Sequence, residues 1–295
     1  MISKLNGVAE AIGAAVGAKL QARPTSRAHG GSINECYRWD TDAGPLFVKV
    51  GPAANQSMYA AEAAGLDELR QAQAVRVPAV RGVGVSGGGT AWLALEWLRL
   101  DGSASADGAL GEQLALQHRR TAPMFGLHRD NTIGSTPQLN ARSESWVEFF
   151  RERRLRYQLD LAARNGHDER LRQRVALLLE RMSGFFTDYQ PVASLLHGDL
   201  WGGNWATGED GRPVIFDPAV YYGDREADLA MTRLFGGFGP DFYAAYASAW
   251  PPDAGAGARA DLYNLYHVLN HLNLFGAGYL SQARALTETL LARLV

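Results

Sequence analysis

Hydrophobic and polar positions change their period along the chain, and the change divides it into two parts. The first part combines helical patterns over 2–21 and 55–74 with strand-like runs within 29–50 and 75–99. The strand-like runs carry β-branched and aromatic residues, and Asp-Ala-Gly-Pro and Ser-Gly-Gly-Gly separate them as turns. This order predicts a small α+β lobe built on an antiparallel sheet.

Beyond residue 100 the pattern becomes mainly helical. Loop composition at 101–111 and an irregular stretch at 121–142 interrupt it, and PVIFDPA predicts a strand at 213–219. Helical periodicity covers 111–120, 143–165, 168–187, 225–235, 239–250, 258–281 and 283–294. We therefore expect an α+β chain with two domains, an N-terminal lobe over 1–98 and a larger, mostly helical lobe over 99–295.

Composition and charge exclude several classes of protein. The 295 residues are 46% hydrophobic and 20% charged, a globular balance, and the net charge of −2 gives no support for a nucleic-acid or anionic-membrane partner. The single cysteine, Cys36, leaves no intramolecular disulfide or zinc cluster. The N-terminus lacks the apolar run of a signal peptide, and no stretch is suited to span a bilayer. We expect a cytoplasmic protein.

The stretch LLHGDLWGGNW at 195–205 places polar residues on a glycine-rich loop between apolar runs. His197, Asp199 and Asn204 have the spacing H-x-D-x-x-x-x-N, which is that of the kinase catalytic loop, where the Asp handles the proton of the nucleophile and the Asn binds metal. The alternative is a tight surface turn. A small sheet lobe followed by a helical lobe is also the architecture of a protein kinase.

Asp217 ends the apolar strand VIF and is a second candidate metal ligand. The sequence TGEDGR before it favours a hairpin that brings Asn204 and Asp217 together. An amide and a carboxylate oxygen, completed by phosphate oxygens, suit Mg²⁺. Pro218 stands where the kinase DFG motif has Phe, so we do not expect DFG-like flipping, and an Asp–Pro turn remains the alternative.

Lys49 in FVKV lies where a kinase strand carries its phosphate-binding lysine. It is one of three lysines among 29 basic residues, and a lysine retained in an arginine-rich chain favours a chemical role. Glu62 follows thirteen residues later among small and apolar neighbours, where a buried carboxylate needs a cation. We expect a Lys49–Glu62 pair; exposed side chains are the alternative.

Two further segments complete the expected nucleotide site. The turn Gly30, Gly31 and Ser32 could bring backbone N–H groups to phosphates, although most Gly-Gly pairs are ordinary turns. The apolar run LALEWL ends the sheet lobe, and in a kinase-like chain it becomes the hinge. Backbone groups around Glu96, Trp97 and Leu98 would then meet the adenine edge; any buried strand is the alternative.

Other polar groups have simpler interpretations. Asp224, Glu226 and Asp228 lie at a helix start, where acidic side chains are favoured. His267 and His271 have the i, i+4 spacing of a metal site but lack the Glu of H-E-x-x-H, and a core or interface role is favoured.

These residues together resemble the fructosamine-3-kinase (ketosamine-3-kinase) family, which has a protein-kinase-like fold related to aminoglycoside and choline kinases. The resemblance covers nearly the whole chain. It is carried by HGDLWGGN (197–204), DPAVYYGDREADLAM (217–231), RDNTIGSTPQLN (129–140), SWVEFFRERRL (145–155), LFGGFGPDFYAAY (234–246) and LYHVLNHLNLFGAGY (265–279).

The resemblance implies ATP-dependent phosphorylation of the 3-hydroxyl of a ketosamine on a protein or a free amino acid, a deglycation repair step. It implies that Asp199 is the base, that Lys49 holds phosphates and that Asn204 and Asp217 bind Mg²⁺. Trp201 could stack on the sugar, and the loop with Asp130 and Asn131 could line the acceptor pocket. A monomer or homodimer is expected. Some relatives carry a redox-linked cysteine in the glycine-rich loop; Ser32 lies there instead, so no redox role is carried over to Cys36.

Two alternatives stay open. One is a kinase of the same fold that acts on an aminoglycoside, choline or related amine, for which the acidic group at 224–228 could bind a cationic acceptor. The other is a nucleotide-binding pseudokinase, although all five catalytic positions hold competent residues.

Overall fold

The computed structural model describes residues 2–21, 24–28, 35–101 and 103–294, and its packing divides the chain into two units. The first comprises the chain up to Ala106 together with Asn204–Ala219; the second comprises Asp107–Gly203 and the chain from Val220 onward. Residues 99–106 and the 204–219 segment therefore pack with the N-terminal lobe, although the sequence expectation placed them in the other. A functional boundary after residue 98 stays a prediction.

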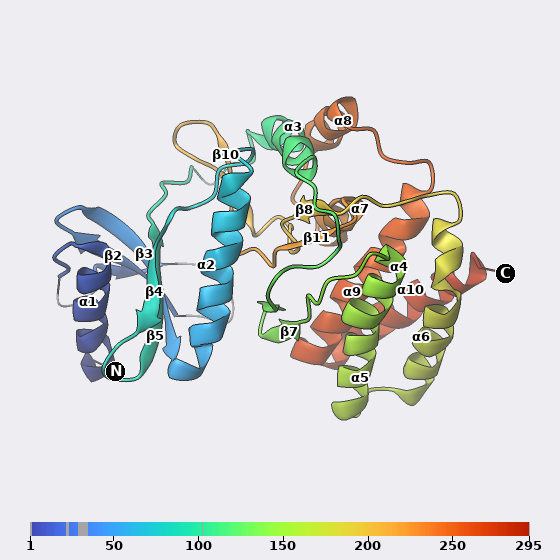
Figure 1. Cartoon of the computed structure of the whole chain (residues 1–295), viewed down its shortest axis with the longest axis horizontal. Coiled ribbons are helices and arrows are strands. Elements are labelled where there is room, and N and C mark those ends of the chain that lie inside the picture. The colour runs from blue at the N-terminus through green and yellow to red at the C-terminus, as the bar shows by residue number, and fades with distance from the viewer. Residues whose placement is uncertain (1, 22–23, 29–34, 102, 295) are drawn as a thin grey trace. The chain divides into compact units, whose positions relative to one another are not determined.

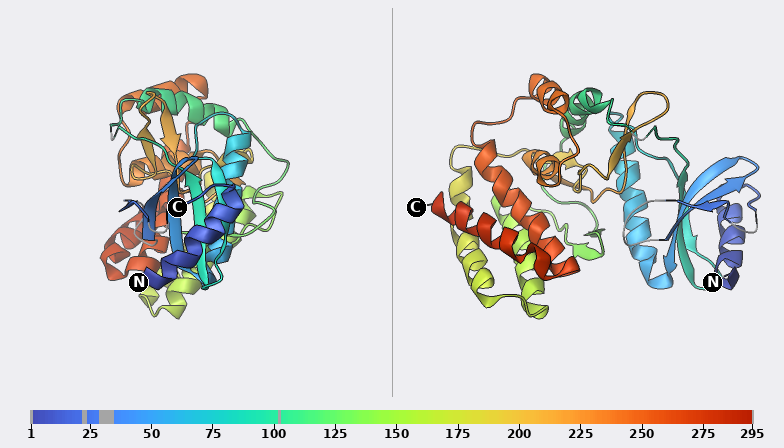
Figure 2. Two further views of the ribbon diagram at one scale, coloured as in Figure 1. Left: turned by 90° about the vertical axis from the view of Figure 1, so that its left-hand side faces the viewer. Right: turned by 180° about the vertical axis from the view of Figure 1, so that it is seen from behind.

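The first unit is built on an antiparallel sheet with the strand order β1-β2-β3-β5-β4. Its strands are β1 (Ser26–Arg27), β2 (Glu35–Thr41), β3 (Gly44–Pro52), β4 (Val80–Val85) and β5 (Thr90–Glu96). Helix α1 (Ile2–Val16) covers one face, and the short 3-10 turn η1 (Ala53–Asn55) leads into α2 (Gln56–Gln71) on the other (Figures 1 and 2). This is the antiparallel-sheet lobe that the sequence predicts.

Strand alternation decides which side chains of β3 face each helix. Val48 and Val50 join the apolar cluster beneath α1, which includes Ile12 and Trp39. Lys49 lies between them and therefore points to the opposite face, toward α2.

A hairpin far along the sequence completes the first unit. Strands β9 (Trp205–Thr207) and β10 (Pro213–Ile215) pair with Trp205 opposite Ile215. Backbone bonds tie the hairpin to the lobe, from Asp101 N–H to the Thr207 carbonyl (2.9 Å) and from Ile215 N–H to the Arg76 carbonyl (3.0 Å). The turn places residues 204 and 217 side by side at its open end.

The second unit is mainly helical, as expected. It contains α3 (Asp107–His118), α4 (Trp146–Phe149), the π-helical segment η2 (Phe150–Arg156), α5 (Tyr157–Arg164), α6 (Glu169–Arg181), η3 (Met182–Phe186), α7 (Glu226–Leu234), α8 (Pro240–Ala249), α9 (Ala256–Phe275), η4 (Ala277–Tyr279) and α10 (Leu280–Ala292). Short antiparallel pairs join β6 (Asn131–Ile133) to β7 (Thr136–Gln138), and β8 (Ser194–Leu196) to β11 (Tyr221–Gly223). The sequence pattern did not predict these four strands.

The described residues were searched for membrane-spanning helices and for clusters of metal-ligating side chains. None of the helices that the structure describes is long and apolar enough to cross a membrane. Within the same residues, no three His, Cys, Asp or Glu side chains converge as a metal cluster. The Nδ1–H of His271 instead donates to the His267 carbonyl oxygen (2.8 Å), so this i, i+4 pair is part of the helix packing.

Candidate active site

Lys49 is the centre of a buried ionic group in the first unit. Its side chain is only 4% exposed, and Nζ lies 2.8 Å from Glu62 Oε1 and 2.7 Å from Asp217 Oδ1. Burial alone would lower the pKa of Lys49, but the carboxylates of Asp217 and Glu62 outweigh it and raise the pKa. Lys49 is therefore charged at neutral pH, and its ammonium has three donors for two carboxylates, so one can reach a further anion.

Asp217 is held in an unusual backbone conformation beside Asn204. Its φ is +56°, a region that few residues other than glycine adopt and that Asp tolerates better than most. The Asn204 carbonyl accepts from Phe216 N–H (3.0 Å), and Asn204 Nδ2 lies 3.5 Å from the Asp217 carbonyl oxygen. Lys49 occupies only Oδ1 of Asp217. The amide and carboxylate oxygens present therefore fit a hard divalent cation that completes its shell with phosphate and water.

Cys36 lies beside this group but is not activated. It pairs with Lys49 across β2 and β3, so both side chains share one face of the sheet. Burial raises the pKa of the Cys36 thiol to about 11, although Lys49 acts in the opposite direction. At neutral pH the group is a protonated thiol, which is a poor nucleophile.

The expected hinge lies at the end of β5. Glu96 N–H donates to the Ala79 carbonyl (2.8 Å), and the Glu96 carboxylate accepts from Arg76 Nη2 (3.2 Å). Of the two backbone groups of Glu96, its N–H is thus already bonded within the lobe. The ring of Trp97 lies against Phe47, with centroids 6.4 Å apart. Gly30, Gly31 and Ser32 lie outside the described residues.

In the second unit, the segment containing Asp199 is held by its backbone. Gly198 has a φ of +82°, which glycine adopts at no steric cost, and it separates His197 from Asp199. The carboxylate of Asp228 accepts from both preceding N–H groups, His197 to Oδ2 (2.7 Å) and Gly198 to Oδ1 (2.9 Å). Asp199 N–H is 3.3 Å from His197 Nδ1.

A chain of hydrogen bonds continues from Asp228 into the core. His118 Nε2 is 3.1 Å from Asp228 Oδ2, and His118 Nδ1 is 2.8 Å from the Tyr246 hydroxyl. Arg225 Nη1 donates to the same hydroxyl (3.2 Å). The two ring nitrogens of His118 thus join the Tyr246 hydroxyl to the Asp228 carboxylate.

From its sequence pattern, Asp228 is interpreted only as an acidic residue at a helix start, and its buried hydrogen bonds to His118 and to the backbone of residues 197 and 198 are not predicted. Burial alone would raise the pKa of Asp228, but the bonds from His118 and Gly198 lower it, so it stays ionised. The available signal was its setting among Ala227, Leu229 and Ala230, since an Asp on an apolar face requires buried partners.

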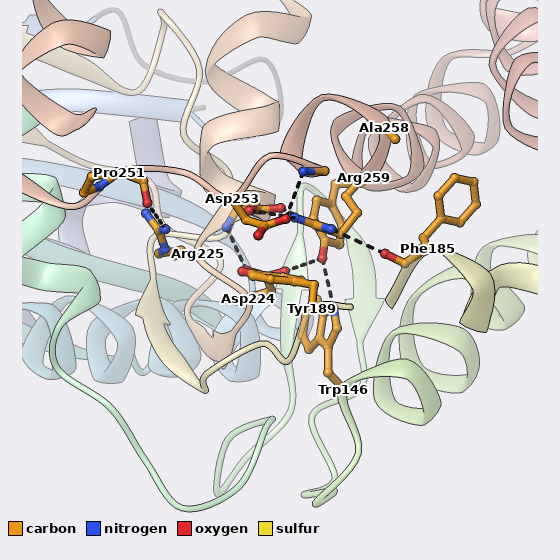
Figure 3. Close-up of polar contacts among 12 residues, drawn as sticks. Trp146, Phe185, Tyr189, Asp224, Arg225, Pro251, Asp253, Ala258 and Arg259 are labelled. Atoms are coloured by element: carbon orange, nitrogen blue, oxygen red, sulfur yellow. Dashed lines mark hydrogen bonds and ion pairs between the residues drawn. The ribbon is translucent and has the colours of Figure 1, made fainter. Parts of the chain in front are cut away.

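Asp224 and Glu226 form a separate buried cluster around Arg259 (Figure 3). Arg259 Nε donates to Glu226 Oε2 (2.7 Å) and Arg259 Nη2 to Asp253 Oδ1 (2.6 Å). The hydroxyls of Tyr189 and Tyr263 both donate to Asp224. Asp224 and Glu226 are at most 2% exposed, so these carboxylates are internal and already satisfied.

The loop with Asp130 and Asn131 is held by a closed set of amide contacts. Asn131 Oδ1 accepts from Gln138 Nε2 (2.8 Å) and Asn140 Nδ2 (2.9 Å), and its Nδ2 donates to the Val220 carbonyl (2.8 Å). Asp130 Oδ1 accepts from Asn140 N–H (2.7 Å). These bonds give both side chains a structural role, and their contact with an acceptor stays a prediction.

Trp201 is exposed beside the Asp199 segment. Its side chain is 38% exposed, and its ring lies across Gly203, where an added Cβ would fall 2.3 Å from the ring. The ring also meets Phe235 edge to face, with centroids 6.3 Å apart. The structure thus leaves Trp201 available for stacking, and that role remains untested.

Comparison with known proteins finds relatives over almost the full length. A family model described as fructosamine kinase matches residues 4–293. The chain is 42% identical over 267 residues to a chloroplastic protein-ribulosamine 3-kinase of Arabidopsis thaliana, covering 90% of this chain and 82% of the relative. A solved structure from Thermobifida fusca, provisionally assigned as a fructosamine-3-kinase, superposes with a TM-score of 0.87 at 32% identity, covering 97% of this chain and 99% of the other.

A more distant likeness concerns the fold alone. The choline kinase of Streptococcus pneumoniae superposes with a TM-score of 0.62 at 14% identity, covering 97% of each chain. Together with the sheet lobe and the helical lobe, this likeness confirms the expected kinase-like α+β fold.

Proposed function

Since the chain belongs to the fructosamine kinase family, we propose that it is an ATP-dependent kinase of the 3-hydroxyl of ketosamines. The observation that carries the proposal is Lys49, a buried, charged lysine bracketed by Glu62 and Asp217. Phosphoryl transfer needs such a preorganised cation on the nucleotide phosphates. The family match supports the class of acceptor.

The first unit supplies the nucleotide site. Lys49 exchanges part of its contact with Asp217 for phosphate oxygens, while Glu62 keeps its ammonium in place. Asn204 and Asp217 would hold Mg²⁺, which would supply positive charge to the phosphates. Because Glu96 N–H is already bonded to Ala79, the Glu96 contact with adenine uses its carbonyl oxygen.

The remaining nucleotide contacts are expected from neighbouring backbone. Leu98 N–H, beyond Trp97, meets the second position of the adenine edge. From the sequence alone, Gly30, Gly31 and Ser32 are predicted to contact the phosphates.

The second unit supplies the base. Asp199 accepts the proton of the sugar hydroxyl as its oxygen bonds to the γ-phosphorus and the bond from that phosphorus to the β-phosphate oxygen breaks. ADP leaves with the electron pair of the broken bond. Asp228 fixes the backbone ahead of Asp199 through His197 and Gly198, so the carboxylate is presented without a reorganisation cost.

The acceptor is a ketosamine carried by a protein or an amino acid, with the ribulosamine form favoured by the name of the plant relative. Trp201 stacks on the apolar face of the sugar. An aminoglycoside or choline acceptor is less supported, since the family match favours ketosamines. Asp224 and Glu226, the acidic residues that could have bound a cationic acceptor, are also buried and paired. Action in the cytoplasm, as a monomer or homodimer, completes the proposal.

The test is coupled ATP turnover with Mg²⁺ on ribulosyl-lysine, fructosyl-lysine, kanamycin and choline, comparing the wild type with Asp199→Asn. We expect turnover on a ketosamine and a loss of at least about 1,000-fold in the variant. Asp188→Asn, at an exposed position in the turn after η3, serves as a control that leaves turnover unchanged.

Each other outcome is decisive. Turnover on kanamycin or choline alone would assign the chain to a different small-molecule kinase. ATP binding without turnover on any acceptor would favour the pseudokinase. Full activity of Asp199→Asn would remove Asp199 as the base.

A further inference from the structure

Exposed aromatic side chains continue away from Trp201 in the second unit. Among the described residues, seven large apolar side chains are exposed, and Trp201, Phe235 and Phe275 are three of them, at 38%, 38% and 54%. Ring contacts link these residues through His271. We call Trp201, Phe235, His271, Phe275 and Tyr279 the aromatic strip.

The ring contacts make the strip one continuous surface. Ring centroids lie 6.3 Å apart for Trp201 and Phe235, and 4.8 Å apart for Phe235 and His271. His271 is also 5.4 Å from Phe275 and 5.1 Å from Tyr279. These separations are in the range of favourable aromatic pairs.

Backbone packing fixes the end of the strip nearest Asp199. Gly202 N–H donates to the Gly236 carbonyl (3.2 Å), and an added Cβ on Gly237 would fall 2.5 Å from the Gly202 Cα. The loops that carry Trp201 and Phe235 are therefore in direct backbone contact, which only glycine allows. The two rings are held together whether or not a ligand is present.

Helix α9 gives the direction and length of the strip. Burial raises the pKa of Tyr266 on this helix, and the Asp199 carboxylate adds to this shift, so the two side chains are within electrostatic reach of one another. Phe275 follows nine residues later on the same helix, a rise of about 13 Å. That length equals about four residues of extended chain.

The strip carries no net charge. Burial lowers the pKa of His271, and its Nδ1–H donates to the His267 carbonyl, so the ring is neutral at physiological pH. A ketosamine carries a protonated secondary amine on the carbon two positions along the sugar from the one with the reacting hydroxyl. Neutral aromatic faces attract such a cation, and apolar side chains next to it gain by burial.

We propose that the aromatic strip binds the carrier of the sugar: the ammonium and alkyl chain of a glycated lysine, followed by apolar side chains of the polypeptide around it. This inference rests on the proposed ketosamine kinase activity and adds a preference for acceptors in polypeptide chains. The sugar positions the hydroxyl at Asp199, and the carrier extends from Trp201 along Phe235 toward Phe275.

The experiment compares acceptors that share one sugar. We use Nα-acetyl ribulosyl-lysine, a ribulosylated pentapeptide with leucine and valine beside the lysine, and the same pentapeptide with serine and glycine there. The enzyme is the wild type and the double variant Phe235→Ala/Phe275→Ala. The double variant Leu116→Ala/Val192→Ala is the control, because these side chains are as exposed, at 53% and 49%, but lie outside the strip.

We expect the double variant in the strip to raise the KM for the apolar peptide about tenfold, with kcat retained. KM for acetyl ribulosyl-lysine, which has the ammonium and the lysine chain but no apolar neighbours, should rise by a smaller factor, about threefold. The control should match the wild type on every acceptor. Melting temperatures of both double variants confirm that the fold is kept.

Three results would overturn the proposal. Equal KM changes on all three acceptors would mean that the strip contacts only the sugar and lysine chain that they share, with no part of the polypeptide, or that it supports the fold. No change on any acceptor would leave the strip without a role in binding. A wild type that turns over no ketosamine would reject the proposed function and this inference together, a pattern distinct from the first two.

Discussion

At the scale of single residues, Lys49 shows how burial and pairing combine in one group. A buried lysine would lose its proton without a counter-charge, and Glu62 and Asp217 supply two. The same contacts order the ammonium before any nucleotide binds. The cost concerns Glu62: burial raises the pKa of its carboxyl and Lys49 opposes this shift, so the charge of Glu62 depends on Lys49.

Replacement of Lys49 should therefore affect activity and stability together. In Lys49→Met, we expect kcat/KM for ATP to fall at least about 100-fold because the phosphates lose their cation. The free energy of unfolding should fall by about 3 kcal/mol, since Glu62 is left buried without a cation. Steady-state kinetics and urea denaturation measure the two effects.

A second substitution separates the two effects. Lys49→Met/Glu62→Gln removes the orphaned charge, so most of the lost stability should return while activity stays absent. A double variant as unstable as Lys49→Met would contradict the ion-pair account. Recovery of ATP turnover in it would contradict the phosphate role.

The residues of this group were predictable from sequence because each has a local signature. Lys49 stands in an alternating strand, Glu62 stands among small residues of a helix, and Asp217 ends an apolar strand. Asp228 was missed because His118, its partner, lies 110 residues earlier. No local pattern records a contact over that separation.

At the scale of elements, long periodic helices, alternating strands and the strand at β10 were predicted, and four other short strands were not. β6, β7, β8 and β11 have three residues each, too few for periodicity to be recognised. β8 pairs with the remote β11, which also bridges to Gly126 through Tyr222, whereas β6 and β7 form a local hairpin. Three of these strands adjoin candidate site residues: β6 begins at Asn131, β7 ends at its partner Gln138, and β8 leads to His197.

The hydrogen-bond chain through α3, α7 and α8 should set the catalytic rate. His118→Phe keeps the ring but leaves Asp228 without its side-chain donor, and we expect kcat to fall about tenfold or more through displacement of Asp199. KM for ATP should stay within about twofold. Tyr246→Phe removes only the far hydroxyl, and its loss should be smaller, about threefold.

Thr287→Val is the matched control for this experiment. Thr287 is also fully buried, and its hydroxyl donates to the Ala283 carbonyl within α10 (2.7 Å). It should lower the melting temperature and leave kcat unchanged. If His118→Phe, like Thr287→Val, lowers the melting temperature and leaves kcat unchanged, the hydrogen bonds of His118 support folding only and do not position Asp199.

At the scale of the whole molecule, the net charge of −2 conceals strong internal electrostatics. Within the described part of the second unit, Asp224, Glu226, Asp228, Arg225 and Arg259 are all nearly inaccessible to solvent. Composition predicted the class of protein but not the burial of these charges, because buried and exposed charges contribute equally to the net charge. The pH dependence of stability can distinguish them.

Asp224 gives the clearest test of these buried charges. Burial, together with the neighbouring Glu226, raises the pKa of Asp224 from 3.8 to about 6. Between about pH 4 and pH 6 the folded protein therefore binds a proton that the unfolded chain has released. Stability falls as pH rises through this window, by at most about 3 kcal/mol, and the group adds no further slope above it.

Asp224→Asn removes this titration. Relative to the wild type, its free energy of unfolding should increase by up to about 3 kcal/mol between pH 4 and pH 7.5, whatever the constant offset caused by lost hydrogen bonds. Urea denaturation at both pH values measures the change, with the exposed Asp160→Asn as control. A difference independent of pH would mean that Asp224 is ionised throughout, with the tyrosine hydroxyls and backbone N–H compensating fully for burial.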